Sequence, residues 1–205
     1  MRLPHAWLIV TLAGLLLALP AVPVLAQKPG AMFQSPLKNF AIPVPTLNFG
    51  TQVVKRNSKD EGTVSFISGT GDSSRIDYVR LPPNAPSLSN DEQQAGYERM
   101  LNGLVASNAN SAIVVQKPYL LDDVPMLMAV VSFPGGSHVM DQRTRKHLDS
   151  TRGLLFFARN GFLYVLHEEL TDVVFDLGKA PPGVEELTRR AERLLPEFYR
   201  SITFK

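Results

Sequence analysis

Residues 154–166, which read LLFFARNGFLYVL, decide the fold of this chain. Asn160-Gly161 stands between two apolar runs, and this dipeptide is a strong hairpin signal because both positions of the tight turn need a positive φ. A two-residue loop places Phe157 opposite Tyr164. Residues on both faces of the two strands are apolar, so both faces need to be covered. The stretch therefore predicts a hairpin at the centre of an antiparallel sheet.

Other segments with strand composition surround this hairpin. A strand next to Pro43 is expected at the edge of a sheet, because proline cannot donate to the strand ladder. A glycine-containing loop at residues 69–74 and the turn at Asp122-Asp123 each join two strand candidates. The expected strands are residues 40–42, 49–54, 63–68, 75–81, 112–116 and 126–133.

Two amphipathic helices complete the pattern. Ser89-Asn90-Asp91-Glu92 matches the capping box that begins a helix, and the Asn-rich residues 107–111 end it. The second helix is expected at residues 183–199, with Pro196 as an interruption. Each helix carries one apolar stripe with steps of three and four residues: Tyr97, Met100, Leu101, Leu104 and Val105 in the first, and Val184, Leu187, Ala191, Leu194, Leu195, Phe198 and Ile202 in the second.

This order of elements predicts an α+β protein with a central antiparallel sheet flanked by amphipathic helices. It resembles the PsbP-like fold, an α/β/α sandwich, over residues 40–205. The resemblance rests on the element order and on stretches such as Phe40-Ala41-Ile42-Pro43 and residues 154–166. It implies an accessory or binding module and assigns a role to no residue of this chain, because fold does not fix function.

The N-terminus reads as a secretory signal peptide. Arg2 precedes an apolar run over residues 6–19, Pro20 and Pro23 follow the run, and Val24-Leu25-Ala26 offers a cleavage site. We expect residues 1–26 to be removed, residues 27–38 to form a flexible leader, and residues 39–205 to form one domain. The protein is then periplasmic or secreted, with no membrane span after cleavage.

Composition narrows the function classes. The 205 residues carry a net charge of +2, and 44% of them are hydrophobic. A near-neutral chain gives no electrostatic footprint for nucleic acid. The absence of cysteine excludes disulfides and thiolate chemistry. No cofactor or metal is predicted, and the oligomeric state is left open.

Two pairs of residues are candidates for catalysis. Ser137 and His138 could supply a nucleophile and a base, but Val139 stands where the nucleophile elbow needs a glycine. His167 and Glu168 suggest a metal-dependent site, but a second histidine at metal-binding spacing is missing. A glycine-rich loop and a half-buried strand histidine are the alternative interpretations of these pairs.

A basic connection between two strands is the candidate binding surface. Residues 135–150 are longer than most loops of compact domains, and such loops often carry function. The predicted binding residues are Arg143, Arg145, Lys146, His147 and Arg152. Arginine forks suit carboxylate and phosphate groups, whereas a solvated charged loop is the alternative interpretation.

The sequence thus predicts a periplasmic or secreted, non-catalytic binding or accessory protein. Its partner would be an unknown envelope protein or an anionic ligand. The alternative is an envelope hydrolase or metal-dependent enzyme that uses Ser137 with His138, or His167 with Glu168.

Overall fold

The computed structural model describes residues 25–26, 29–47, 50–84, 88–171, 173 and 182–205. Residues 1–24, which hold most of the predicted signal peptide, lie outside the described part of the chain. The α+β class is confirmed, because antiparallel strands and two helices make up the described elements. Among the described residues, no helix is long and apolar enough to cross a membrane.

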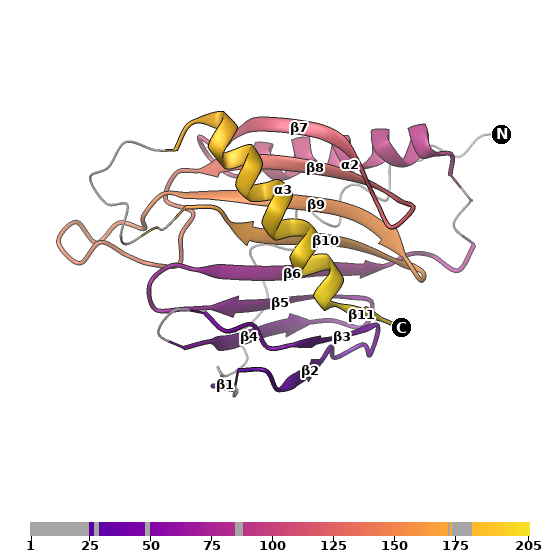
Figure 1. Cartoon of the computed structure of the whole chain (residues 1–205), viewed down its shortest axis with the longest axis horizontal. Coiled ribbons are helices and arrows are strands. Elements are labelled where there is room, and N and C mark those ends of the chain that lie inside the picture. The colour runs from indigo at the N-terminus through magenta and orange to yellow at the C-terminus, as the bar shows by residue number, and fades with distance from the viewer. Residues whose placement is uncertain (1–24, 27–28, 48–49, 85–87, 172, 174–181) are drawn as a thin grey trace.

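The described strands form one large and one small sheet (Figure 1). Eight strands make the large sheet in the order β1-β4-β5-β6-β10-β9-β8-β7, and every pairing in it is antiparallel. Its strands are β1 (Leu25–Ala26), β4 (Gln52–Asn57), β5 (Glu61–Ile67), β6 (Ser73–Arg80), β7 (Ala112–Leu121), β8 (Val124–Phe133), β9 (Ser150–Arg159) and β10 (Phe162–Glu169).

The hairpin predicted from residues 154–166 is confirmed in its place and its register. β9 and β10 are central strands, and Phe157 lies opposite Tyr164. Asn160 and Gly161 both have positive φ, at 49° and 75°, as the tight turn requires.

The small sheet has the order β11-β3-β2 and corrects one expectation. Its strands are β2 (Met32–Gln34), β3 (Phe40–Pro43) and β11 (Thr203–Phe204). β2 lies within residues 27–38, which we expected to be a flexible leader. Phe33 in β2 is buried and packs edge-on against Phe66 of the large sheet. The ordered chain therefore begins before residue 39, because burial of one aromatic ring fixes this short strand.

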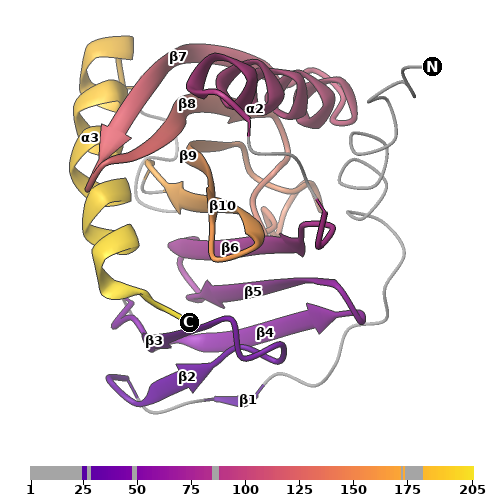
Figure 2. The same cartoon turned by 90° about the vertical axis from the view of Figure 1, so that its right-hand side faces the viewer.

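Two helices pack on opposite faces of the large sheet (Figure 2). α2 (Asn90–Ala106) begins with the predicted capping box at Ser89 and Glu92, and buries Tyr97 and Leu101 against alternate residues of β8, β9 and β10. α3 (Val184–Ser201) continues through Pro196 and buries its apolar stripe on the other face, with the core residues Leu155 and Leu166.

The connection between β8 and β9 leaves the body of the protein. It extends away from the strand ends as a narrow loop on the left of Figure 1. We call residues 134–149 the basic finger. The strands β6, β9 and β10 meet the base of the finger and position the groups described next.

Candidate functional site

The backbone of the basic finger is held by hydrogen bonds between its two arms. Its two arms are joined by the Val139 carbonyl, which accepts from the Leu148 N–H, and by the Leu148 carbonyl, which accepts from the Ser137 N–H. Met140 and His147 form an antiparallel bridge above these bonds. The finger therefore has a fixed direction up to its tip.

Asp141 organises the tip. Its Oδ1 accepts from the backbone N–H groups of Arg143 and Thr144, at 2.7 and 2.8 Å, and its own N–H donates to the Lys146 carbonyl. Arg145 has a φ of 57°, which few residues other than glycine adopt. These bonds to the carboxylate lower the pKa of Asp141. The turn thus holds the three basic residues Arg143, Arg145 and Lys146 in a defined backbone.

The cations of the tip are free to meet a partner. Arg143, Arg145, Lys146 and His147 are exposed. The first three make no ion pair with any residue in the described part of the chain. His147 has its Nδ1 atom 2.8 Å from the Ser137 carbonyl, so it helps to close the finger.

Arg152, the fifth predicted binding residue, lies elsewhere. It is on β9 at the base of the finger, and only 18% of its side chain is exposed. Its Nη2 donates to the Gly136 carbonyl at 2.5 Å, and its guanidinium stands 5.5 Å from the centre of the Phe133 ring. Arg152 therefore anchors the finger and does not join the exposed cations, because its guanidinium is held by the Gly136 carbonyl, the Ser150 hydroxyl and the nearby Glu169 carboxylate.

Glu169 on β10 also stabilises the base of the basic finger through hydrogen bonds. Its carboxylate accepts from the Ser150 and Thr171 hydroxyls and from the Thr151 N–H, and lies 3.8 Å from Arg152. With 3% of its side chain exposed, this carboxylate is satisfied by hydrogen bonds and a nearby cation. Such compensation is what a buried charge requires.

A second polar group lies on the same face of the sheet, which we call the β6 cluster: Thr63, Arg75, Asp77 and His167. Asp77 Oδ1 accepts from the Thr63 hydroxyl at 2.6 Å and from Arg75 Nε at 2.8 Å. Its Oδ2 lies 2.9 Å from His167 Nε2. His167 is buried, and neither ring nitrogen has an aligned hydrogen-bond partner among the described residues.

Burial and charge set the protonation of this cluster. Burial lowers the pKa of His167, and Arg75 and Arg152 add to this effect against the opposing pull of Asp77. Burial alone would raise the pKa of Asp77, but Arg75 and His167 outweigh it and hold that pKa well below its usual range. Both directions favour an ionised carboxylate beside a neutral imidazole.

The structure does not bring the predicted catalytic pairs together. The Ser137 hydroxyl accepts from the Val139 N–H, whereas His138 Nε2 lies 2.6 Å from the Ser68 carbonyl. His167 and Glu168 are neighbours on a strand and point to opposite faces of the sheet. Within the described ranges, no three acidic or histidine side chains are arranged to hold a metal ion.

Sequence reasoning missed the β6 cluster. Asp77 and His167 come from strands that are 90 residues apart, and only their pairing in the sheet brings them together. One signal was present: Arg75 and Asp77 alternate with apolar residues on a strand that is otherwise suited to a half-buried sheet.

Comparison with known proteins gives structural matches but no sequence match. No protein-family model matches the chain, and no curated protein matches its sequence. A solved structure, the solution structure of cyanobacterial PsbP (CyanoP) from Synechocystis sp. PCC 6803, is similar in fold, with 7% sequence identity and a TM-score of 0.46. The match covers 85% of this chain and 92% of that chain. The element order of the sequence resembles the same family, and nothing about activity follows from the match.

Proposed function

We propose that this chain is an exported, non-catalytic binding or accessory protein and that the tip of the basic finger is its recognition surface. The observation that carries the proposal is the fixed turn at Asp141, which displays Arg143, Arg145 and Lys146 as exposed side chains that form no salt bridge with the described residues. Such a set of cations suits carboxylate, phosphate or sulfate groups. Because the backbone of the turn is already ordered, it loses little conformational entropy on binding.

The rest of the proposal concerns the scaffold. We interpret the fold as an α/β/α sandwich of the PsbP-like type, and the packing of α2 and α3 on opposite faces of the large sheet supports this interpretation. A scaffold with a closed core and one rigid projection is typical of a module that binds through a loop.

Two triple variants with equal charge test the recognition surface. The first replaces Arg143, Arg145 and Lys146 by Ser. The control replaces Lys59, Arg99 and Arg193 by Ser, three exposed cations on other elements. Retention of purified protein on immobilised poly-glutamate, a mimic of an acidic protein, and on immobilised heparin, a polysulfated ligand, is measured as salt is raised. The same variants then serve as baits for envelope extract to identify the partner.

We expect the finger variant to elute at much lower salt than the wild type, with the control close to the wild type. Retention on poly-glutamate alone would indicate an acidic protein, and retention on heparin alone a sulfate- or phosphate-rich ligand. Equal elution of both variants would overturn the proposal, because net charge rather than the finger would then set binding.

Export has its own test. Periplasmic protein expressed from the full sequence should have lost residues 1–26 by intact-mass measurement, and with them Trp7, so that it shows tyrosine but no tryptophan fluorescence. Full-length protein retained in the membrane would contradict the predicted signal peptide.

A further inference from the structure

The tip of the basic finger carries an exposed apolar side chain as well as cations. Met140 is 48% exposed and directly precedes the turn that displays Arg143, Arg145 and Lys146. It is one of five large apolar side chains that are exposed in the described part of the chain. Removal of such a side chain from water is favourable. A partner that covers the whole tip therefore offers an apolar region next to anionic groups.

The backbone of the finger fixes the position of Met140. The bridge between Met140 and His147 is flanked by two backbone hydrogen bonds that join the arms. This arrangement is the non-hydrogen-bonded type of antiparallel pair, in which the two side chains lie close together on one face. Met140 is therefore presented beside the exposed ring of His147, immediately below the cationic turn.

The acidic groups of the finger lie behind the cations. Residues 142–148 contain no acid. The Asp141 carboxylate accepts from backbone N–H groups of the turn, and the Asp149 carboxylate accepts from the Gly135 N–H at 2.8 Å, at the base of the finger. The end of the finger therefore has a positive local field, which attracts anionic groups.

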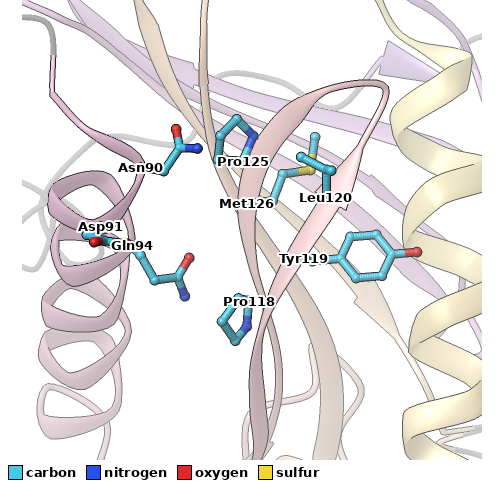
Figure 3. Close-up of a pocket in the computed structure, with 8 residues that line it drawn as sticks. All are labelled: Asn90, Asp91, Gln94, Pro118, Tyr119, Leu120, Pro125 and Met126. Atoms are coloured by element: carbon cyan, nitrogen blue, oxygen red, sulfur yellow. The ribbon is translucent and has the colours of Figure 1, made fainter.

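The shape of the tip suits a flat partner. The finger projects beyond the ends of β8 and β9 (Figure 1). Small ligands are bound in concave sites that bury most of their surface. The cleft of about 300 Å³ between α2 and the β7–β8 hairpin (Figure 3) has no finger residue in its lining. The narrow, convex tip thus favours an extended surface over a small molecule.

The surface of an anionic bilayer combines the required features. Its phosphate groups lie directly above acyl chains, and apolar side chains of peripheral proteins enter this boundary to a depth of about 5–10 Å. Basic side chains near the same surface are attracted by anionic lipids. A folded acidic protein needs a fitted socket to cover Met140, whereas fluid lipid adapts to it. The observations therefore favour lipid as the partner.

We infer that the tip of the finger binds the anionic surface of a lipid bilayer. Arg143, Arg145 and Lys146 contact the lipid phosphates, and Met140 enters the boundary between headgroups and acyl chains. This inference rests on the proposed role of the finger as recognition surface and specifies its partner.

Co-sedimentation with lipid vesicles tests the binding. The vesicles contain phosphatidylcholine alone, or phosphatidylcholine with about 30% phosphatidylglycerol, and the protein is the soluble product of the full sequence. The finger variant and its equal-charge control, both described above, test the cations. Met140→Ser tests the apolar contact, and its control is Leu120→Ser, an exposed apolar residue at the cleft of Figure 3. All variants share one N-terminus, so that segment produces no difference between them.

Insertion of the side chain has a separate readout. The chain has no cysteine, so Met140→Cys creates a single site for a fluorophore that brightens in an apolar environment. Leu120→Cys with the same label is the control. Both side chains are exposed, so the substitutions should leave the fold intact.

We expect binding to the anionic vesicles and none to phosphatidylcholine alone. The finger variant should bind about 100-fold more weakly, since each of its three cations contributes about fivefold near an anionic surface, and this deficit should shrink as salt is raised. Met140→Ser should weaken binding about fivefold at every salt concentration, because apolar burial is not screened. The label at residue 140 should brighten, and the label at residue 120 should not.

The inference is overturned if the wild type does not bind the anionic vesicles, if the finger variant binds as its control does, or if the label at residue 140 stays in water. These outcomes can be separated from failure of the proposed function. Loss of retention on poly-glutamate or heparin in the finger variant, without vesicle binding by the wild type, would keep the finger as recognition surface and rule out the bilayer. If neither retention nor vesicle binding depends on the finger, both proposals are wrong.

Discussion

Gly161 shows how one backbone angle fixes the central hairpin. Its φ is 75°, and a Cβ added to it would meet no atom within 4 Å. Any cost of substitution therefore arises from the backbone and not from a clash. We expect Gly161→Val to lower the free energy of unfolding by about 1–3 kcal/mol, measured by urea denaturation. Gly161→Asn is the control, because asparagine adopts positive φ more readily. An equal loss in both variants would contradict a backbone origin.

Asp77 makes a second prediction at this scale. Its carboxylate accepts hydrogen bonds from the Thr63 hydroxyl and from Arg75 Nε, and it faces His167. Asp77→Asn should therefore lower the free energy of unfolding at pH 7 by about 2 kcal/mol. The lowered pKa of Asp77 means that its ionised form is favoured in the folded state. Its contribution is full above the ordinary aspartate pKa of 3.8, which applies to the unfolded chain, and is lost progressively as the pH falls below that value.

Denaturation of wild type and Asp77→Asn over a range of pH tests this linkage. The difference in stability should be constant near neutral pH and should narrow as the pH falls below about 4. A difference that does not change with pH would show that the carboxylate acts through packing alone.

At the scale of elements, the basic finger depends on its anchor. We predict that Arg152→Gln loosens the finger without unfolding the domain. The variant loses the bond to the Gly136 carbonyl, whereas Glu169 keeps its bonds from Ser150 and Thr151. Hydrogen exchange of the Ser137 and Leu148 N–H groups should become at least about tenfold faster, and exchange in β9 and β10 should not.

Arg143→Gln at the tip is the matched control for Arg152→Gln. Arg143 is exposed, and its replacement removes the same charge. It should leave exchange at the base of the finger unchanged. Faster exchange throughout the domain in Arg152→Gln would instead assign Arg152 to the stability of the whole fold.

Local patterns predicted the elements whose signals lie within one stretch of sequence. The β9–β10 hairpin follows from Asn160-Gly161, and α2 follows from the capping box at Ser89. β2 was missed because its stability comes from the contact between Phe33 and Phe66, which no local pattern shows. β7 runs through Pro118 over ten residues, and an edge strand tolerates this proline.

The same distinction holds for the candidate site. Arg143, Arg145 and Lys146 were predictable because charge and loop length are read directly from the sequence. The β6 cluster and the role of Arg152 depend on which strands become neighbours. β6 pairs with β10 across a long separation in sequence, and this pairing is a property of the assembled sheet.

At the scale of the whole molecule, Glu168 makes the free energy of unfolding depend on pH. It lies on the face of the sheet opposite His167 and accepts from the Ser74 hydroxyl at 3.0 Å. Burial raises its pKa to about 8 from an ordinary value of 4.5, and the nearby Glu169 and Glu197 add to the effect. Its ionised form is disfavoured in the folded state, so the stability due to this group is full below pH 4.5 and is lost as the pH rises to about 8.

We therefore expect Glu168→Gln to reduce the loss of stability between pH 5 and pH 9, as measured by urea denaturation at both values. Glu185→Gln is a control, since this carboxylate is exposed on α3. If both variants keep the wild-type dependence on pH, the loss originates in another group.

The pairing of β1 with β4 gives export a further consequence. Cleavage after Ala26 would remove β1, whose two residues pair with Val53 and Gln52, and would make β4 the outermost strand of the large sheet. An uncovered edge strand is a template for aggregation, and charged side chains guard against it. Lys55 and Arg56 occupy the middle of β4. Removal of the signal peptide would thus leave β4 as an unpaired edge strand. The charges of Lys55 and Arg56 would then keep the processed protein from associating through this edge.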